Sequence, residues 1–288
     1  MSNQRKKNDN MQNVFYVCDC YDELDDYILS KGFRKILLVC SNSIKNLSIW
    51  KYFLTLKDRV GIEVVVFHDF TPNPKYEEVV DGVKVFNENI CDTIVAVGGG
   101  SAIDVAKCIK LFSNMDSKGN YLKQQISPNG IKLIAIPTTA GTGSESTRYA
   151  VIYYNGEKQS VTHDSCIPSA VVFNPYFLFS LPDYQKKATM LDALCHATES
   201  FWSVNSTKES IEFATQAITI ILANYKGYFI NEIQACKQML MAANLAGKAI
   251  NITQTTAGHA MSYKLTSLYG IAHGHAVDFS GFSNSTLM

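Results

Sequence analysis

The sequence lacks a surplus of charge of either sign. Its 288 residues include 26 Lys and Arg against 26 Asp and Glu, so the formal net charge is zero, and only 18% of the residues are charged. Proteins whose main partner is nucleic acid usually carry a basic surplus. The composition therefore argues against nucleic acid as a partner.

Long apolar runs are missing too, although hydrophobic residues make up 47% of the chain. No run approaches the ~20 apolar residues that a membrane-spanning helix needs. The first residues, MSNQRKKNDNMQ, are polar, and no apolar core of a secretory signal follows them. We therefore expect a disordered tail over 1–12, no membrane partner and a cytoplasmic protein.

The eight cysteines include no CxxC pair, and only Cys18 and Cys20 lie close together. This spacing excludes a zinc ribbon and a small disulfide scaffold. Several cysteines stand in apolar surroundings such as LLVC and AKCIK. We predict reduced core residues without a redox role.

Proline is absent beyond position 182, and the pattern of the chain changes there. Before it, short apolar runs predict buried strands at 34–40, 61–67, 92–97 and 131–136, with further candidates at 151–154 and 170–173. An amphipathic stretch over 76–89 predicts a helix. This alternation indicates parallel βαβ units. Beyond it, apolar spacings of three and four predict long helices at 184–204, 208–228 and 230–250. We expect a Rossmann-like α/β domain over 13–179 and an all-α domain over 180–288.

Two loops rich in small residues follow predicted strands. Residues 98–101, Gly-Gly-Gly-Ser, lead from a strand into a helix, a turn in which a phosphate can approach the backbone N–H groups. On the ordinary interpretation of that helix, Asp104 caps it or forms an ion pair within it, and Lys107 is solvated. The second loop, PTTAGTGSEST over 137–147, is dense in hydroxyls and glycine, which favours contact with a polar ligand. Open α/β sheets bind ligands at this edge.

Four of the six histidines fall in the predicted helical half, which also contains Asp192. Asp192 and His196 are four residues apart, which places both on one helix face. With His259 and His273 they form a mixed oxygen and nitrogen set that suits Zn²⁺ or Fe²⁺. Each histidine taken alone is an ordinary hydrogen-bonded core residue.

Four motifs together resemble the iron-containing (group III) alcohol dehydrogenases: GGGSAIDVAK (98–107), IPTTAGTGSE (136–145), LDALCHATES (191–200) and AGHAMSYKLTSLYGIAHGHA (257–276). The resemblance implies a dinucleotide-binding domain followed by a metal-binding domain, with NAD(P)H and Fe²⁺ or Zn²⁺ as cofactors. It implies Asp192, His196, His259 and His273 as metal ligands, with His275 outside that set. The implied cofactor-binding residues are Ser41, Gly98, Gly99, Gly100, Ser101, Asp104, Thr138, Thr139, Thr142, Ser144 and Lys158. A small aldehyde or alcohol is the implied substrate, and a homodimer is the family expectation.

The sequence departs from the family pattern at two places. Many members carry a histidine four residues after the third ligand, whereas this chain has Tyr263, so Tyr263 or water is expected to relay the proton. Members that prefer NAD often carry an aspartate after the first strand, whereas this chain has Ser41 with Lys45 nearby. That change makes NADP an acceptable cofactor.

The residues around the second loop look most like the phosphonoacetaldehyde reductase branch of the family. Arg148 follows the loop, and its guanidinium is well matched to a phosphonate dianion. Lys264 adds a further charge next to Tyr263. Solvation of these two cations, or their pairing with Glu145, is the alternative. A neutral short-chain aldehyde or a diol is the alternative substrate.

The C-terminal residues after His273 suggest a third alternative. Members of the family continue into further helices, whereas this chain ends in DFSGFSNSTLM, which is polar, contains glycine and is predicted to be poorly helical. We therefore expect a truncated metal-binding domain. An inactive homologue that only binds nucleotide or a partner stays open beside the enzyme.

Overall fold

The computed structural model describes residues 12–18 and 20–282, without the side chains of 263, 264, 266, 267, 281 and 282. The tail predicted over 1–12 therefore lies almost wholly outside the described residues. The chain divides into two compact units, Met1–Pro137 with Arg148–Phe173, and Thr138–Thr147 with Asn174–Met288. The loop that follows the fourth predicted strand thus belongs to the second unit.

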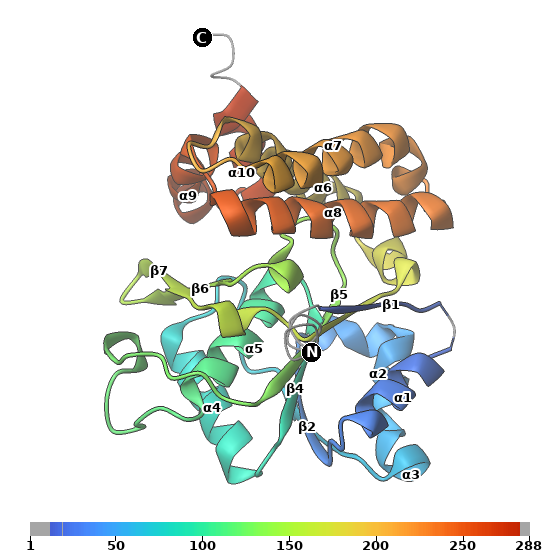
Figure 1. Ribbon diagram of the computed structural model, residues 1–288, viewed down its shortest axis with the longest axis vertical. Coiled ribbons are helices and arrows are strands. Elements are labelled where there is room, and N and C mark those ends of the chain that lie inside the picture. The colour runs from blue at the N-terminus through green and yellow to red at the C-terminus, as the bar shows by residue number, and fades with distance from the viewer. Residues whose placement is uncertain (1–11, 19, 283–288) are drawn as a thin grey trace, which may run out of the picture. The chain divides into compact units, whose positions relative to one another are not determined.

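A six-stranded, fully parallel sheet forms the centre of the first unit (Figure 1). Its strands are β1 (Asn13–Tyr16), β2 (Lys35–Cys40), β3 (Glu63–Phe67), β4 (Thr93–Gly98), β5 (Lys132–Pro137) and β8 (Ala170–Phe173), in the order β1-β8-β5-β4-β2-β3. Every residue of β4 is buried, as the continuous apolar run predicts for a strand that is covered on both faces. The sheet confirms the Rossmann-like α/β class.

Among the described residues, five α-helices accompany the sheet: α1 (Asp22–Ser30), α2 (Ser48–Leu54), α3 (Leu56–Val60), α4 (Tyr76–Glu88) and α5 (Gly100–Phe112). Helix α5 contacts β2, β4 and β5, and its residues from 105 to 112 are all buried. This helix begins directly at the end of β4. Gly98, Gly99 and Gly100 therefore form the turn at the carboxyl edge of the sheet.

Two of the predicted strand regions form different sheets. Residues 170–173 join the parallel sheet as β8, whereas β6 (Tyr149–Tyr154) and β7 (Glu157–Thr162) form a separate antiparallel hairpin. The turn between them contains Asn155 and Gly156, which both have positive φ. Asn-Gly is the preferred pair for such a two-residue turn.

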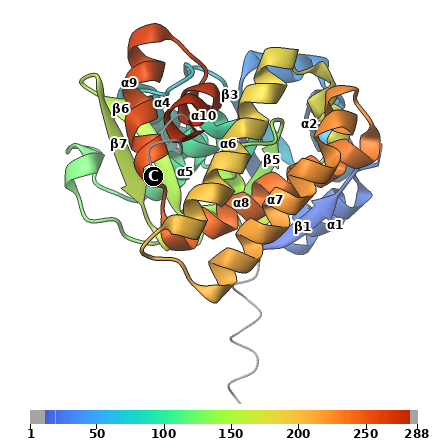
Figure 2. The ribbon, with the colours of Figure 1, turned by 90° about the horizontal axis from the view of Figure 1, so that it is seen from above.

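The second unit is helical, as predicted. Its helices are α6 (Asp183–Trp202), α7 (Lys208–Phe229), α8 (Ile233–Thr253), α9 (Ala257–Tyr269) and α10 (His273–Phe282). Helices α6, α7 and α8 lie side by side, and α10 packs on α6 and α9 (Figure 2). Within the described ranges, no helix is both long and apolar enough to span a membrane.

The prediction that residues 278–288 are poorly helical is wrong for residues 278–282, which belong to α10. The other residues of that segment lie outside the described residues. Ala276 and Val277 are fully buried. Ser280 is buried as well, and its hydroxyl donates to the carbonyl of Ala276 in the preceding turn. Burial of this helix face against its neighbours outweighs the weak helix propensity of the segment.

Candidate metal centre and cofactor-binding loops

Helix α6 brings the carboxylate of Asp192 and the ring of His196 to one face. His196 Nε2 lies 3.8 Å from Asp192 Oδ1, and both side chains are buried. The distance confirms that the spacing of four places both groups together. Because α6 packs against three other helices, this face is held inside the unit.

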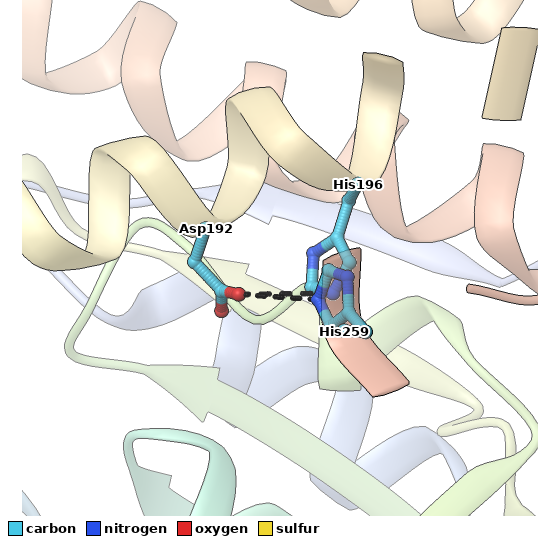
Figure 3. Close-up of side chains that lie close together, drawn as sticks. All are labelled: Asp192, His196 and His259. Carbon is cyan, nitrogen blue, oxygen red and sulfur yellow. Dashed lines mark ion pairs between the residues drawn. The ribbon is translucent and has the colours of Figure 1, made fainter. Parts of the chain in front are cut away.

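His259, near the start of α9, completes a compact cluster (Figure 3). Its Nε2 lies 3.5 Å from Asp192 Oδ1, and its ring stacks on His196 at 4.4 Å between centroids. One candidate ligand atom from each of the three residues lies within 4.8 Å of the others. The structure thus joins residues that are far apart in the sequence.

His273, the first residue of α10, lies beside the cluster. Its Nε2 is 4.0 Å from Asp192 Oδ1, and its side chain is 39% exposed. Gly274 follows and allows the close approach, because a Cβ there would stand 1.9 Å from the carbonyl oxygen of Ala188 in α6. Three of the four residues that the family resemblance implied as ligands thus form the cluster, and His273 lies at its edge.

Tyr184 holds the turn that precedes His273. Its hydroxyl accepts a hydrogen bond from the backbone N–H of Ala272 at 3.3 Å and bonds His275 Nδ1 at 3.1 Å. His275 Nδ1 thus bonds Tyr184, which is not one of the implied metal ligands. Tyr184 and His275 together fix both sides of the His273 backbone.

The chemistry of the cluster fits a divalent metal. Asp192 Oδ1, His196 Nδ1 and both ring nitrogens of His259 are buried and have no hydrogen-bond partner among the described residues. Burial raises the pKa of Asp192, but the histidines outweigh it and hold that pKa far below its usual value. Burial lowers the pKa of His196 to about 4, so its ring is neutral at neutral pH. An anionic oxygen beside neutral imidazole is a donor set that Zn²⁺ and Fe²⁺ accept.

Glu199, which the sequence interpretation did not single out, also contacts the cluster. It lies on α6, is 2% exposed, and its Oε2 stands 3.1 Å from His259 Nδ1. Burial raises its pKa, but contacts with His259 and with backbone N–H groups lower it to about 2. The spacing of three from His196 was visible in the sequence, although a glutamate on a helix is usually solvated.

In the first unit, the glycine turn links the end of β4 to the start of α5. Gly98 has φ +156°, and a Cβ there would stand 2.7 Å from Ala102 Cβ, so the position needs glycine. Helix α5 begins at Gly100, and Ser101 lies in its first turn. The N–H groups of this turn lack partners within the helix and favour anions.

Two charged residues of α5 bond to the β6 strand rather than to solvent. Asp104 Oδ2 accepts from the N–H of Val151 at 3.0 Å, and Lys107 donates to the carbonyl of Tyr149 at 2.7 Å. The ordinary interpretation of Lys107 as a solvated residue is wrong, because the residue is fully buried and its ammonium donates to that carbonyl. Lys158 lies nearby, where burial lowers its pKa to about 8 despite the attraction of Asp104.

Ser41 lies directly after β2, at the same carboxyl edge of the sheet as the glycine turn. It precedes a short 3₁₀ helix over Asn42–Asn46 and bonds the hydroxyl of Ser43 at 2.7 Å. Strands β2 and β4 are neighbours, while β3 lies on the other side of β2. The chain thus reverses its direction of travel across the sheet at this point, which is where such sheets bind dinucleotides.

The Thr-Gly loop, residues 138–147, packs within the second unit. Ser146 Oγ donates to the carbonyl of Asn244 in α8, and the Asn244 amide donates to Glu145 Oε1. Thr142 Oγ1 accepts from the N–H of Ser144. Thr138, Thr139 and Thr142 are half-buried, and Ser144 is buried. The four predicted hydroxyl residues therefore lie on a loop that is anchored to α8.

Of the three residues predicted to serve the substrate, the structure describes the side chain of Arg148. Its guanidinium lies 3.4 Å from Asp164 Oδ1 and donates to the Tyr149 hydroxyl at 3.3 Å. Its side chain is 34% exposed, and that of Asp164 is 82% exposed. The side chains of Tyr263 and Lys264 lie outside the described residues.

Comparison with known proteins accounts for both units. Residues 12–175 match the family described as iron-containing alcohol dehydrogenase, and residues 186–280 match the C-terminal part of the same family. An aldehyde-alcohol dehydrogenase 2 from Entamoeba histolytica is 32% identical over 86% of this chain. A phosphonoacetaldehyde reductase from Streptomyces viridochromogenes is 33% identical over 74% of it.

A solved structure gives the same picture at the level of the fold. The sulfoacetaldehyde reductase of Bifidobacterium kashiwanohense in complex with NAD⁺ superposes with a TM-score of 0.86 at 28% identity, over 95% of this chain and 75% of that one. The chain spans 30% of the length of the Entamoeba relative and 56% of the Streptomyces relative. Because both family descriptions match and together span almost all of the chain, it belongs to the iron-containing alcohol dehydrogenase family.

Proposed function

We propose that the protein reduces a small aldehyde to an alcohol with NAD(P)H and a divalent metal. The observation that carries the proposal is the buried cluster of Asp192, His196 and His259, because each of these residues has a buried side-chain N or O atom that lacks a hydrogen-bond partner among the described residues. Buried polar atoms are normally satisfied, so such a group needs an explanation. A bound cation supplies one.

Asp192, His196, His259 and His273 are the residues that would hold the metal. When bound, Fe²⁺ or Zn²⁺ acts as a Lewis acid that polarises the aldehyde oxygen. The protein's own part is to keep the donor atoms in place and to exclude competing groups. The packing of α6 against α8 and α10 performs the first of these tasks.

The cofactor residues support NAD(P)H as the hydride donor. The backbone of residues 98–101 would receive the pyrophosphate, and Asp104, Lys158 and the Thr-Gly loop would contact the rest of the dinucleotide. Members of the family that prefer NAD often carry an aspartate after the first strand, where this chain has Ser41 with Lys45 nearby. Without that carboxylate, the 2′-phosphate of NADPH is not repelled at this position, so NADPH is accepted. Residues 13–179 then serve mainly the cofactor and residues 180–288 mainly the metal.

An anionic aldehyde is the proposed substrate, with phosphonoacetaldehyde as its best representative. Two relatives, one by sequence and one by structure, are named reductases of phosphono- and sulfoacetaldehyde. The pairing of Arg148 with an exposed Asp164 is weak, because solvent screens such pairs. The guanidinium can therefore turn to a phosphonate. Lys264 and Tyr263 are proposed to add charge and to deliver the proton.

The substrate proposal is tested by comparing Arg148→Ala with Arg148→Lys. Loss of a charge-assisted hydrogen bond costs about 1.5–3 kcal/mol, which corresponds to about a 10- to 100-fold rise in KM. We expect that rise for phosphonoacetaldehyde, a smaller one in the lysine variant, and none for propionaldehyde. An equal effect on both aldehydes would favour a neutral aldehyde or diol as the substrate.

A further inference from the structure

Glu199 is a buried carboxylate that accepts two backbone hydrogen bonds at the start of α9 and lies close to the ring of His259. Its Oε1 accepts from the backbone N–H of His259 at 3.0 Å, and its Oε2 accepts from the backbone N–H of Thr256. The ring atom His259 Nδ1 lies 3.1 Å from Oε2. Glu199 is 2% exposed, so water does not compete for these contacts.

The backbone groups fix the chemical character of the carboxylate. A backbone N–H only donates, so both oxygens of Glu199 act as acceptors. Both ring nitrogens of His259 face a carboxylate oxygen without forming a hydrogen bond, but Nδ1 lies nearer to Glu199 Oε2, at 3.1 Å, than Nε2 lies to Asp192 Oδ1, at 3.5 Å. The ring proton of the neutral imidazole is therefore better stabilised on Nδ1. The opposite ring atom, Nε2, then keeps its lone pair. That atom lies 3.5 Å from Asp192 Oδ1, inside the cluster.

We propose that Glu199 is a positioning residue that selects the tautomer of His259 and orients its ring toward the metal. This proposal rests on the proposed metal-dependent function, because a free lone pair on His259 Nε2 matters only if that atom binds a metal. A carboxylate behind a ligating histidine raises the basicity of the ligand and prevents rotation of the ring. Here the same carboxylate also caps the first turn of α9.

Through its backbone bonds and its contact with the His259 ring, the carboxylate of Glu199 connects α6 to the first turn of α9. Glu199 lies one turn after His196, so α6 supplies two candidate ligands and also the group that orients the third. The N–H groups at the start of α9 cannot move without breaking the contacts to Glu199. The position of His259 is therefore set from both its backbone and its ring.

The direct test measures the histidine tautomers of the metal-free protein by long-range ¹H–¹⁵N NMR at alkaline pH, where the imidazoles are neutral. The His259→Ala variant identifies the signals of His259. We expect the wild type to carry the proton on Nδ1 and Glu199→Leu to carry it mainly on Nε2. A wild-type ring with its proton on Nε2 would overturn the proposal, whether or not the variant folds.

Zn²⁺ titration provides the second readout. We expect Glu199→Leu to bind Zn²⁺ about 10- to 100-fold more weakly than the wild type. The matched control is Glu212→Leu, which removes an exposed glutamate of α7 and should leave the affinity unchanged. Unchanged affinity in a folded Glu199→Leu protein would contradict the proposed role. Failure of the wild type to bind Zn²⁺ or Fe²⁺ would instead remove the proposed function, while the tautomer would still report on Glu199.

Discussion

Gly143 in the Thr-Gly loop and Gly247 in α8 approach each other so closely that neither has room for a side chain. A Cβ on Gly143 would stand 2.6 Å from Gly247 Cα, and one on Gly247 would stand 2.5 Å from the Gly143 carbonyl oxygen. Gly143 also has φ +59°, which favours glycine by itself. The Thr-Gly loop, whose hydroxyl side chains are predicted to contact the cofactor, thus packs directly against the backbone of α8.

Gly247→Ala should destabilise the protein, although alanine is the better helix former. Helix propensity alone favours alanine by about 0.8–1.0 kcal/mol. The new Cβ would stand 2.4 Å from Ser146 Oγ, however, and overpacking of this kind costs about 1–3 kcal/mol. Urea unfolding measures the balance, with Gly130→Ala as the control because that position has open space around it. A more stable Gly247→Ala protein would show that the loop is not seated as described.

Gly274→Ala should weaken metal binding through His273. The added Cβ would meet the carbonyl oxygen of Ala188 at 1.9 Å, so α10 must move away from α6. His273 begins that helix and would move with it. We expect a loss of about 10- to 100-fold in Zn²⁺ affinity, the range seen when a supporting group of a metal site is removed. Wild-type affinity in this variant would mean that His273 is not a ligand.

Lys158 gives the cofactor affinity a pH dependence with a defined sign. Burial lowers its pKa to about 8, so the ammonium is charged below that pH and neutral above it. If it contacts the dinucleotide, the Kd for NADPH should rise as the pH increases through about 8, and Lys158→Gln should flatten that rise. Fluorescence titration of NADPH across this range makes the measurement. An identical pH profile in wild type and variant would remove Lys158 from the cofactor site.

The lowered pKa of Lys158 affects the stability of the protein in the opposite direction. Between about pH 8 and the ordinary lysine pKa, the unfolded chain holds the proton that the folded chain has lost. Stability therefore gains from Lys158 as the pH rises through that window. Cofactor affinity and the free energy of unfolding should thus change in opposite directions over the same range.

The alternation of apolar runs was sufficient to predict the parallel sheet and the three long helices. It did not predict β1, which has four residues and none that is buried, or α1, whose nine residues are shorter than the window of about 11–18 residues over which helical periodicity is judged. It also missed the burial of Lys107, since lysine is rarely buried and its acceptor, a carbonyl of β6, is distant in sequence.

The candidate site was predictable to different degrees. The spacing of Asp192 and His196 predicts their proximity from helix geometry alone. His259 and His273 were joined to them only as a donor set of suitable chemistry and through the resemblance to a family, because no local pattern connects α9 and α10 to α6. Glu199 could not be recognised, since its role depends on N–H groups that only the folded chain brings within reach.

The metal content of the purified protein, measured together with NADPH-dependent aldehyde reduction, tests the central claim most directly. The account predicts about one equivalent of Fe²⁺ or Zn²⁺ per chain and measurable turnover in the wild type. Both should be lost in His196→Ala and retained in His68→Ala, which removes an exposed histidine of the first unit. Full activity in metal-free His196→Ala would contradict the account. A wild type that binds NADPH but neither metal nor aldehyde would favour an inactive homologue.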